Sequence, residues 1–360
     1  MSTKGYNQFS IRSTRSNRRK RKTFPRLLIF AVLAGAAYFF FFKDQKKEQA
    51  RRAENKPAGH ELSESQSATA AELKNSGDDA KSAGNSSAGK VSRPEKAENK
   101  SAVSRELHQK LIKLYSEAKN CLNSGEYEKV LVLTRKIMDA VPETSRAWSQ
   151  AANLLGEANA KILFSDYRSK NKVIYTVVPG DSLDKIVKKF CTTLEALQSA
   201  NNLPKTSSTI RVGQNLVVYK GFWKIIIKKS LFRLYLYNSG ELFKVYRIAT
   251  GKGNKTPEGA FVIASKIKNP EWTFNGVKYP YGSPQNVLGT RWMRLRPAAV
   301  NPNKNLSGYG IHGTWQPESI GKMASNGCIR MKNSDVEELF AIIPKYTNPD
   351  GNLVPVIIEK

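Results

Sequence analysis

Residues 43–103 constrain the chain more than any other stretch, because they cannot form a packed core. They are low in aromatic residues and rich in Ala, Ser, Lys, Glu, Gly and Asn, as residues 82–90 show. Such a segment buries too little apolar area to offset the conformational entropy that folding removes. We therefore expect a disordered linker that acts as a flexible tether. The chain of 360 residues has room for two or three folded domains.

The segment before this linker has the pattern of a membrane anchor. Residues 1–26 form a basic tail, and residues 27–42 are apolar but shorter than the roughly 20 residues of a full membrane span. The excess of positive charge places the tail in the cytoplasm and the rest of the chain outside it. A cleaved signal peptide is the alternative, with Ala34-Gly35-Ala36 as a small-residue site, but cleavage there leaves an aromatic new end. We expect an uncleaved, single-pass transmembrane helix.

Residues 104–170 carry apolar residues at three- and four-residue steps, which predicts helices. Gly125-Glu126-Tyr127 and Pro142 interrupt the pattern. The order helix, Gly-x-Tyr, helix, Pro, helix resembles a tetratricopeptide-like helical hairpin, which implies binding of a protein partner or self-association. A helical spacer packed on its neighbour is the other interpretation.

Residues 174–220 predict the order strand, turn, two helices, loop, strand. They open with Y-x-V-x-x-G-D-S-L from Tyr175 and close with V-G-Q-x-L from Val212. This stretch resembles a LysM domain, a small α/β fold of order βααβ, which implies binding to glycans that contain N-acetylglucosamine. The residues implied in glycan binding are Gly180, Asp181, Ser182, Asn202, Leu203, Pro204 and Ile210. Alternatively, these residues only shape the fold, since Gly180 and Asp181 also suit a turn and a helix cap.

A histidine and a cysteine 16 positions apart point to chemistry. His312 lies within residues 310–314 (GIHGT), and Cys328 lies within residues 325–331 (SNGCIRM). A thiol attacks as the thiolate, and a nearby imidazole is the usual base at neutral pH. Gly327 leaves room for a substrate carbonyl and leaves backbone N–H groups to stabilise an oxyanion. Core filling or half of a metal site are the alternatives, but the sequence places no further His or Cys nearby.

The motifs of residues 222–360 resemble those of the L,D-transpeptidase catalytic domain, the YkuD-type family. H-G-T followed by S-x-G-C-I-R-M is its signature, and T-P-x-G-x-F from Thr256 and L-G-x-R-W from Leu288 match in order and spacing. The resemblance implies a mainly β catalytic domain, a β-sandwich with its site in a groove. Asn326 departs from the His, Arg or Lys of many members, which bears on substrate preference.

The resemblance implies acyl transfer by a cysteine. Cys328 would be the nucleophile and His312 the general base and acid. The Gly313 carbonyl would orient the imidazole, and the Gly327 backbone would help to form the oxyanion hole. The residues implied around the substrate are Trp292, Thr314, Ser325, Asn326 and Arg330. Of these, Arg330 would either hold an anionic group or brace the loop.

The implied reaction forms 3→3 cross-links in peptidoglycan. The thiol attacks a stem tetrapeptide, releases the terminal D-Ala, and passes the acyl group to the amine of a diamino acid on a second stem. Water as the acceptor makes an L,D-carboxypeptidase, and a protein amine makes an enzyme that anchors proteins to the wall. A wall-binding scaffold without chemistry is the alternative from another class. The acceptor and the third stem residue do not follow from the sequence.

Four local patterns predict elements of the catalytic region. A hairpin turns at residues 238–240 between apolar segments, and residues 261–266 predict a strand. A helix is expected over residues 335–343 with Ser334 as its cap, and a closing strand over residues 353–358.

The net charge of +29 calls for an interpretation, and anionic partners are one. Nucleic acid is not favoured, because the basic excess is spread out and no nucleic-acid motif accompanies it. Outside a bacterial cytoplasmic membrane, in the periplasm or cell wall, the available polyanions are wall polymers, stem-peptide carboxylates and lipid headgroups. We expect no metal and no cofactor. Cys121 and Cys191 are expected to be small buried residues without a disulfide.

Overall fold

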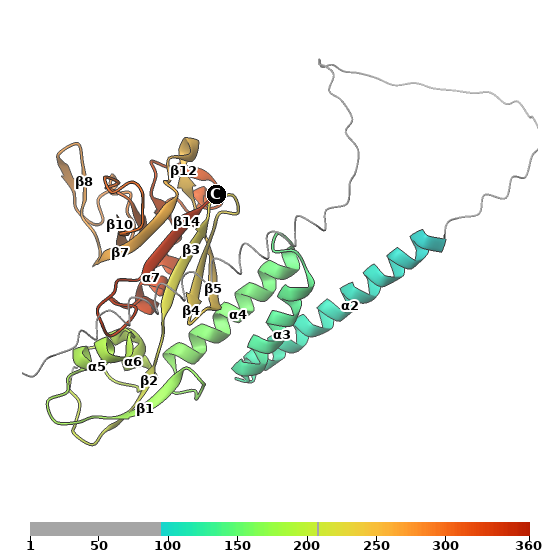
Figure 1. The fold of residues 1–360 in the computed structure, drawn as a ribbon, viewed down its shortest axis with the longest axis horizontal. Helices are drawn as coiled ribbons and strands as arrows, with labels where there is room; N and C mark the ends of the chain where they lie inside the picture. The colour runs from blue at the N-terminus through green and yellow to red at the C-terminus, as the bar shows by residue number, and fades with distance from the viewer. Residues whose placement is uncertain (1–94, 207–208) are drawn as a thin grey trace, which may run out of the picture. The chain divides into compact units, whose positions relative to one another are not determined.

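The computed structural model describes residues 95–206 and 209–360, and residues 90–360 form one compact unit (Figure 1). The predicted basic tail, transmembrane helix and most of the predicted linker lie outside the described residues. Of the helices that the structure describes, none has both the length and the apolar character needed to cross a membrane.

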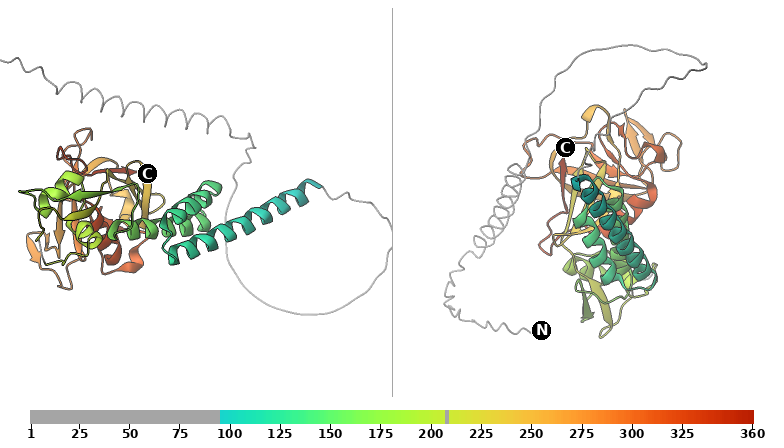
Figure 2. Two further views of the ribbon diagram at one scale, coloured as in Figure 1. Left: turned by 90° about the horizontal axis from the view of Figure 1, so that it is seen from below. Right: turned by 90° about the vertical axis from the view of Figure 1, so that its right-hand side faces the viewer.

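Three successive helices confirm the helical pattern: α2 (Glu95–Asn123), α3 (Tyr127–Ala140) and α4 (Arg146–Phe164). They lie side by side in the order of the chain (Figures 1 and 2). The start of α2 at Glu95 corrects the predicted end of the linker at residue 103, because Ala, Glu and Lys in this stretch are good helix formers. Ser145 begins α4, and its Oγ accepts the N–H of Trp148 at 3.1 Å.

The helical segment packs against the catalytic region. The Asn159 side chain on α4 donates to the Phe243 carbonyl at 2.8 Å. Gly156 faces the stem of Lys244, where an added Cβ would lie 2.7 Å from Cγ. Leu155 belongs to the same buried cluster as the core of the sheet. These contacts favour a helical spacer packed on its neighbour, and the tetratricopeptide-like interpretation stays a prediction.

The region after α4 forms the predicted strand–helix–helix–strand order. Its elements are β1 (Lys172–Thr176), α5 (Leu183–Phe190), α6 (Leu194–Ala200) and β2 (Asn215–Tyr219), with β1 antiparallel to β2. The Oγ atoms of Ser182 and Thr193 cap α5 and α6. Cys191 ends α5 and, like Cys121, is buried with a free thiol, as expected.

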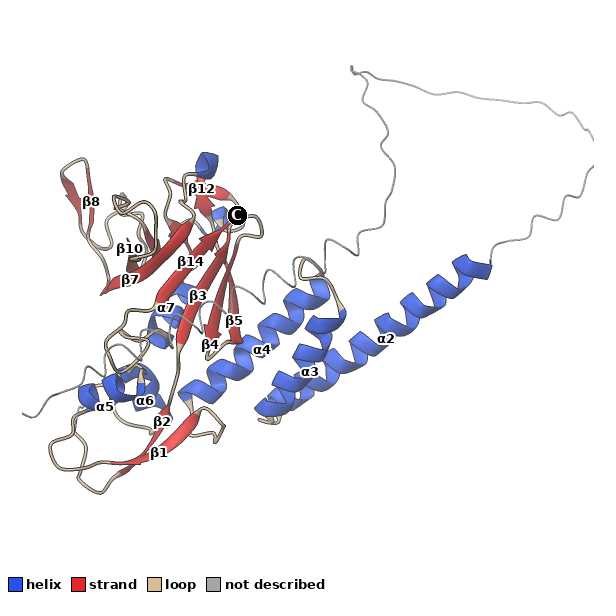
Figure 3. Cartoon of the chain, viewed as in Figure 1, coloured by secondary structure: helices blue, strands red, loops and turns tan. Residues whose placement is uncertain are grey.

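The catalytic region is built on one eight-stranded sheet of order β13-β11-β10-β7-β14-β3-β4-β5 (Figure 3). Its strands are β3 (Trp223–Lys228), β4 (Arg233–Asn238), β5 (Glu241–Arg247), β7 (Gly259–Lys268), β10 (Arg291–Pro297), β11 (Gly310–His312), β13 (Ile329–Arg330) and β14 (Pro355–Glu359). Two short pairs accompany it: β6 (Thr250–Gly251) with β12 (Met323–Ser325), and β8 (Trp272–Phe274) with β9 (Val277–Tyr279). Single 3₁₀ turns are η1 (Lys252–Asn254) and η2 (Pro317–Ser319).

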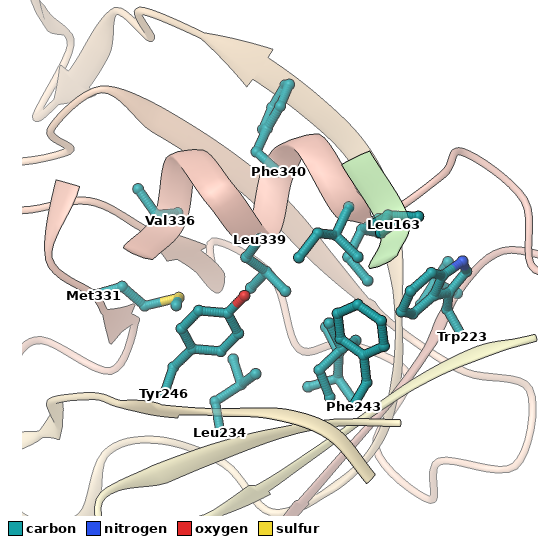
Figure 4. Close-up of a cluster of buried hydrophobic side chains, with 14 of the residues drawn as sticks. Leu163, Trp223, Leu234, Phe243, Tyr246, Met331, Val336, Leu339 and Phe340 are labelled. Carbon is teal, nitrogen blue, oxygen red and sulfur yellow. The ribbon is translucent and has the colours of Figure 1, made fainter. Parts of the chain in front are cut away.

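The sheet curls until its two edges meet, which modifies the predicted β-sandwich. Ala249, directly after β5 at one edge, forms a bridge with Arg330 in β13 at the other edge. The helix α7 (Asn333–Ile342) packs on this sheet, and Figure 4 shows its Leu339 directed towards Tyr246 and Leu234. The mainly β prediction is therefore confirmed, but the strands form one continuous sheet and not two separate ones.

Two local predictions are changed by the structure, and the predicted closing strand is confirmed. The apolar segment from Trp223 contains a second turn at residues 229–232, where Phe232 has a φ of +49°, so it forms β3 and β4 and not one strand. Ser334 does not cap α7, because the cap position is Lys332 and no side chain bonds to the helix start. The closing strand β14 is central, parallel to β3 and antiparallel to β7.

Candidate active site

Two adjacent parallel strands bring the predicted histidine and cysteine to the same region. In the pairing of β11 with β13, Ile311 lies opposite Ile329 and His312 opposite Arg330. Cys328 directly precedes β13, so the same register places it beside the first residue of β11. The two residues therefore lie on neighbouring strand and loop elements.

The His312 side chain is buried, with 2% of the residue exposed. Its Nδ1 lies 2.6 Å from the carbonyl oxygen of Gly313. This bond makes Nδ1 the N–H nitrogen and leaves Nε2 to accept a proton. Burial lowers the pKa of His312 to about 4; the positive charge of Arg330 acts in the same direction, whereas the carbonyls of Gly313 and Leu288 oppose it. The imidazole is therefore neutral at pH 7.

Trp292 covers one side of the histidine. It pairs with His312 across β10 and β11, and the two ring centroids are 5.7 Å apart. Gly310 provides the space, because a Cβ there would lie 2.5 Å from the Trp292 ring. Trp292 is half-buried and thus limits the movement of the imidazole.

The Cys328 thiol is partly exposed and donates to the Gly308 carbonyl, with Sγ 3.5 Å from the oxygen. Burial raises the pKa of this thiol, while the backbone N–H of Gly310 and the charge of Arg330 lower it. Both His312 and Cys328 are therefore uncharged at neutral pH, and Arg330 is the charged group that acts on both.

Hydrogen bonds fix the backbone of the loop that carries the cysteine. The Ser325 Oγ donates to the Cys328 carbonyl at 2.5 Å and accepts the Gly327 N–H at 3.1 Å. This corrects the prediction that the Gly327 N–H faces an oxyanion, since a neighbouring hydroxyl already takes it. Thr256 Oγ1 donates to the Gly327 carbonyl at 2.9 Å and accepts the Gly251 N–H at 2.8 Å. In a trans peptide the N–H opposes the carbonyl, so Thr256 also sets the direction of the Cys328 N–H.

Two of the predicted substrate residues are used within the protein. Thr314 is buried, and its Oγ1 accepts the Gln316 N–H at 3.1 Å. Ser325 is buried in the bonds just described. Small hydroxyl side chains next to turns commonly bond to nearby backbone in this way, and substrate binding by Thr314 and Ser325 stays a prediction. Asn326 is exposed, and Arg330 is half-buried with Nη1 3.2 Å from Gln316 Oε1.

The residues that the sequence interpretation did not single out include Asn333 and Gly310. Asn333 begins α7, and its Oδ1 accepts the Thr290 N–H at 3.2 Å. A Cβ added to Gly313 would lie 2.1 Å from the same oxygen, and one added to Gly289 would lie 2.3 Å from it, so neither position has room for a side chain. The helix start thus braces the turn after His312. The sequence could have pointed to Thr256, because it is the first residue of the T-P-x-G-x-F motif, but nothing in the sequence pointed to Asn333.

Within residues 95–206 and 209–360, no three His, Cys, Asp or Glu side chains gather as a metal site requires.

Comparison with known proteins places this geometry in a family. The model of the L,D-transpeptidase catalytic domain, YkuD, matches residues 223–358, and that of the LysM domain matches residues 175–218. A protein named as an L,D-transpeptidase, YkuD of Bacillus licheniformis, is 36% identical over 183 residues, which are 49% of this chain and 96% of the relative. The chain belongs to the YkuD-type L,D-transpeptidase family. A second protein named in the same way, YkuD of Bacillus subtilis, is 34% identical and covers 48% of this chain and 94% of its own length.

Among solved structures, the catalytic domain of an Enterococcus faecium L,D-transpeptidase is 25% identical to this YkuD-type chain. That match covers 38% of this chain and 96% of the other, with a TM-score of 0.28, which is too low to decide the fold. Both domain resemblances, to the YkuD-type catalytic domain and to LysM, are confirmed by the family models.

The LysM domain of this YkuD-type chain uses several predicted glycan-binding residues in its own fold. Asp181 Oδ2 accepts the Val178 N–H at 3.0 Å and the Tyr175 hydroxyl at 2.7 Å. Ser182 caps α5. The remaining predicted residues divide between exposed loop positions and the domain core; they are Gly180, Asn202 and Pro204 in the first group, and Leu203 and Ile210 in the second. Glycan binding by these residues stays a prediction.

Proposed function

We propose that this chain is a peptidoglycan L,D-transpeptidase in which Cys328 is the nucleophile and His312 the general base and acid. The observation that carries the proposal is the parallel register of β11 and β13, which places a partly exposed thiol beside the start of β11, two residues from the buried, oriented imidazole of His312. The family membership supports the same chemistry.

In the first half-reaction, Cys328 Sγ attacks the carbonyl of the third residue of a stem tetrapeptide. The thiol proton passes to Nε2 of His312, and the Cys328 N–H stabilises the oxyanion. The bond to the terminal D-Ala then breaks. His312 returns the proton to the leaving amine, and a thioester remains on Cys328.

The charges around the pair suit proton transfer during the attack. Both groups are neutral at rest, because burial raises the pKa of the thiol and lowers that of the imidazole. A preformed thiolate–imidazolium pair is therefore not the resting state. Arg330 supplies a fixed positive charge beside both groups, and it lowers the cost of the thiolate as it forms.

In the second half-reaction, the amine of a diamino acid on another stem attacks the thioester carbonyl. The C–S bond breaks, the amine loses a proton, and the thiol is restored, which gives a 3→3 cross-link. Water in place of the amine gives carboxypeptidase activity, and a protein amine gives wall anchoring. We propose that the LysM domain holds the glycan and that the N-terminal segment anchors the chain outside the cytoplasm, at a bacterial membrane.

The test is intact-mass analysis of the full-length chain with muropeptide tetrapeptides, beside Cys328→Ala. We expect a cross-linked dimer that has lost one D-Ala with the wild type and none with the variant. A tripeptide without dimer, abolished by the same substitution, identifies hydrolysis as the reaction. If the folded, reduced wild type gives neither product nor an acyl-enzyme, the chain is a scaffold and the proposal is wrong.

A further inference from the structure

A cavity of about 830 Å³ lies between the helical segment and the catalytic region. We call it the α4 groove. One wall is the face of α4 that carries Trp148 and Asn153. The others come from β4 and β5, from η2 with the following Ile320, and from the start of α7 with Asp335. The groove is therefore built only when the helical segment is packed on the sheet, and the catalytic mechanism above uses none of these residues.

Four cationic side chains line the α4 groove: Arg233, Lys244, Arg247 and Lys332. Among the described lining residues Asp335 alone is acidic.

Only one of these cations forms an ion pair within the described residues. Lys244 is neutralised by Glu338, with Nζ 2.6 Å from Oε1. Arg233 is bonded to neutral acceptors, the Glu143 carbonyl at 2.7 Å and the Ser149 hydroxyl at 2.8 Å. Arg247 and Lys332 are exposed and form no ion pair in the part of the chain that the structure describes. The groove thus keeps an excess of positive charge, which attracts an anionic occupant.

One residue that lines the groove, Lys332, lies on the same face of its segment as the cysteine. Side chains alternate in an extended strand, and Ile329 and Met331 are buried in the core. Cys328, Arg330 and Lys332 therefore share the opposite face. Lys332 lines the groove, and four residues of extended chain, about 13 Å, separate it from Cys328. A tetrapeptide also spans about 13 Å when extended, so one end of it can lie in the groove while an amine reaches the thioester.

We infer that the α4 groove binds the carboxylates of the second stem peptide, the one that brings the attacking amine. This inference rests on the proposed function, and it gives the helical segment a role in the choice of acceptor. The mixed lining favours a peptide over a phosphate polymer, because apolar side chains such as Ile320 line the groove together with the cations. Once bound, the amine attacks the Cys328 thioester, the C–S bond breaks, and the amine proton returns to the thiolate.

The experiment separates the two half-reactions in the full-length chain. A donor tetrapeptide with an acetylated side-chain amine first forms the acyl-enzyme, since it cannot act as an acceptor. A second tetrapeptide with a free amine is then added over a range of concentrations, and the loss of the acyl-enzyme is followed by intact mass. The same acceptor with amidated carboxyl groups is the chemical control.

The groove variant is Arg247→Glu with Lys332→Glu, and a milder form replaces both by Gln. The matched control is Lys161→Glu with Lys220→Glu, which changes the net charge equally at two exposed lysines outside the groove. We expect the half-saturating concentration of the acidic acceptor to be about tenfold higher in the groove variant than in the wild type, and to rise less in the Gln form. The rate of acylation by the donor should stay the same in both variants. The amidated acceptor should not distinguish the wild type from the groove variant.

An equal effect of the groove and control variants overturns the inference, as does an equal effect on the amidated acceptor. If the wild type forms no acyl-enzyme, the proposed function fails and this inference falls with it. If the acyl-enzyme forms but the acceptor response is unchanged, only the groove inference is wrong.

Discussion

His312 is held neutral by its surroundings, and this links one residue to the stability of the fold. Burial lowers its pKa from 6.5 to about 4 in the folded protein. In the unfolded chain His312 binds a proton near its ordinary pKa of 6.5. Its contribution to the free energy of unfolding is therefore fully present above pH 6.5. It is lost as the pH falls through the folded pKa, in total on the order of 3 kcal/mol.

We predict that His312→Gln reduces this loss of stability between pH 7 and pH 4. The free energy of unfolding in urea, measured across that range, is the test. His108→Gln, at an exposed histidine on α2, is the control and should leave the slope of the wild type. The same slope in the wild type and in His312→Gln contradicts a buried neutral imidazole.

At the residue scale, the sequence pointed to candidate reactive residues but not to the hydrogen-bond partners around them. Spacing and flanking glycines pointed to His312 and Cys328, because acyl transfer by a thiol needs these side-chain types. Thr314 and Ser325 also carry hydroxyls near the site, but their bonds to local backbone depend on turn geometry that the sequence pattern does not contain. The N–H of Gly327 was misassigned for the same reason.

At the scale of elements, the cysteine loop depends on a side chain from the segment after β6. Thr256 Oγ1 bonds to the Gly327 carbonyl and the Gly251 N–H, and only 1% of the residue is exposed. We predict that Thr256→Val lowers the rate of acylation about 10- to 100-fold, because the Cys328 N–H is no longer aimed. Thr256→Ser should restore most of the rate.

The measurement for this loop is the single-turnover rate of acyl-enzyme formation, with kcat and KM determined separately. A loss in kcat with KM nearly unchanged identifies a positioning role. Thermal unfolding of each variant provides the structural control, since leaving a buried carbonyl unpaired costs about 1–3 kcal/mol by itself. Equal rates for the Val and Ser forms contradict the prediction.

The end of α7 is held by a partly buried lysine on β7. Lys266 Nζ donates to the carbonyls of Phe340 and Ile343, the first at 2.6 Å, and lies 4.2 Å from the centre of the Phe340 ring. Lys266→Met should destabilise the protein by about 2–3 kcal/mol, because the carbonyls of the helix end lose their donor. Lys268→Met, which removes an exposed pair with Glu195, should cost less than about 1 kcal/mol. Chemical unfolding compares the two, and equal losses rule out the cap.

Elements were predicted where periodicity and turn residues agreed, as in the βααβ order of residues 172–219. Their assembly was not. The meeting of the sheet edges at Ala249 and Arg330 joins residues 81 positions apart, and the central position of β14 is equally non-local. Hydrophobic pattern predicts which face is buried, but it does not say which strand lies beside it.

For the whole molecule, the main question is whether the helical segment acts with the catalytic region on which it packs or opens as a module of its own. Its α4 shares a buried cluster with the sheet, and Asn159 bonds across the contact to the Phe243 carbonyl. Periodicity alone predicted the helices, but their partner depends on side chains that the pattern treats as neutral, such as Gly156 and Asn159. The two interpretations of this segment make opposite predictions about how it opens.

We predict that Asn159→Ala lowers hydrogen-exchange protection in α4 and in β5 together. The substitution leaves the Phe243 carbonyl of β5 buried without its donor, at a cost of about 1–3 kcal/mol, and both elements share the core that is loosened. Exchange measured by mass spectrometry on peptides from both elements tests this, with Asn153→Ala on the same helix as the control for helix propensity. If α4 loses protection alone while β5 keeps its own, the helical segment opens as an independent module, and the packed-spacer interpretation is wrong.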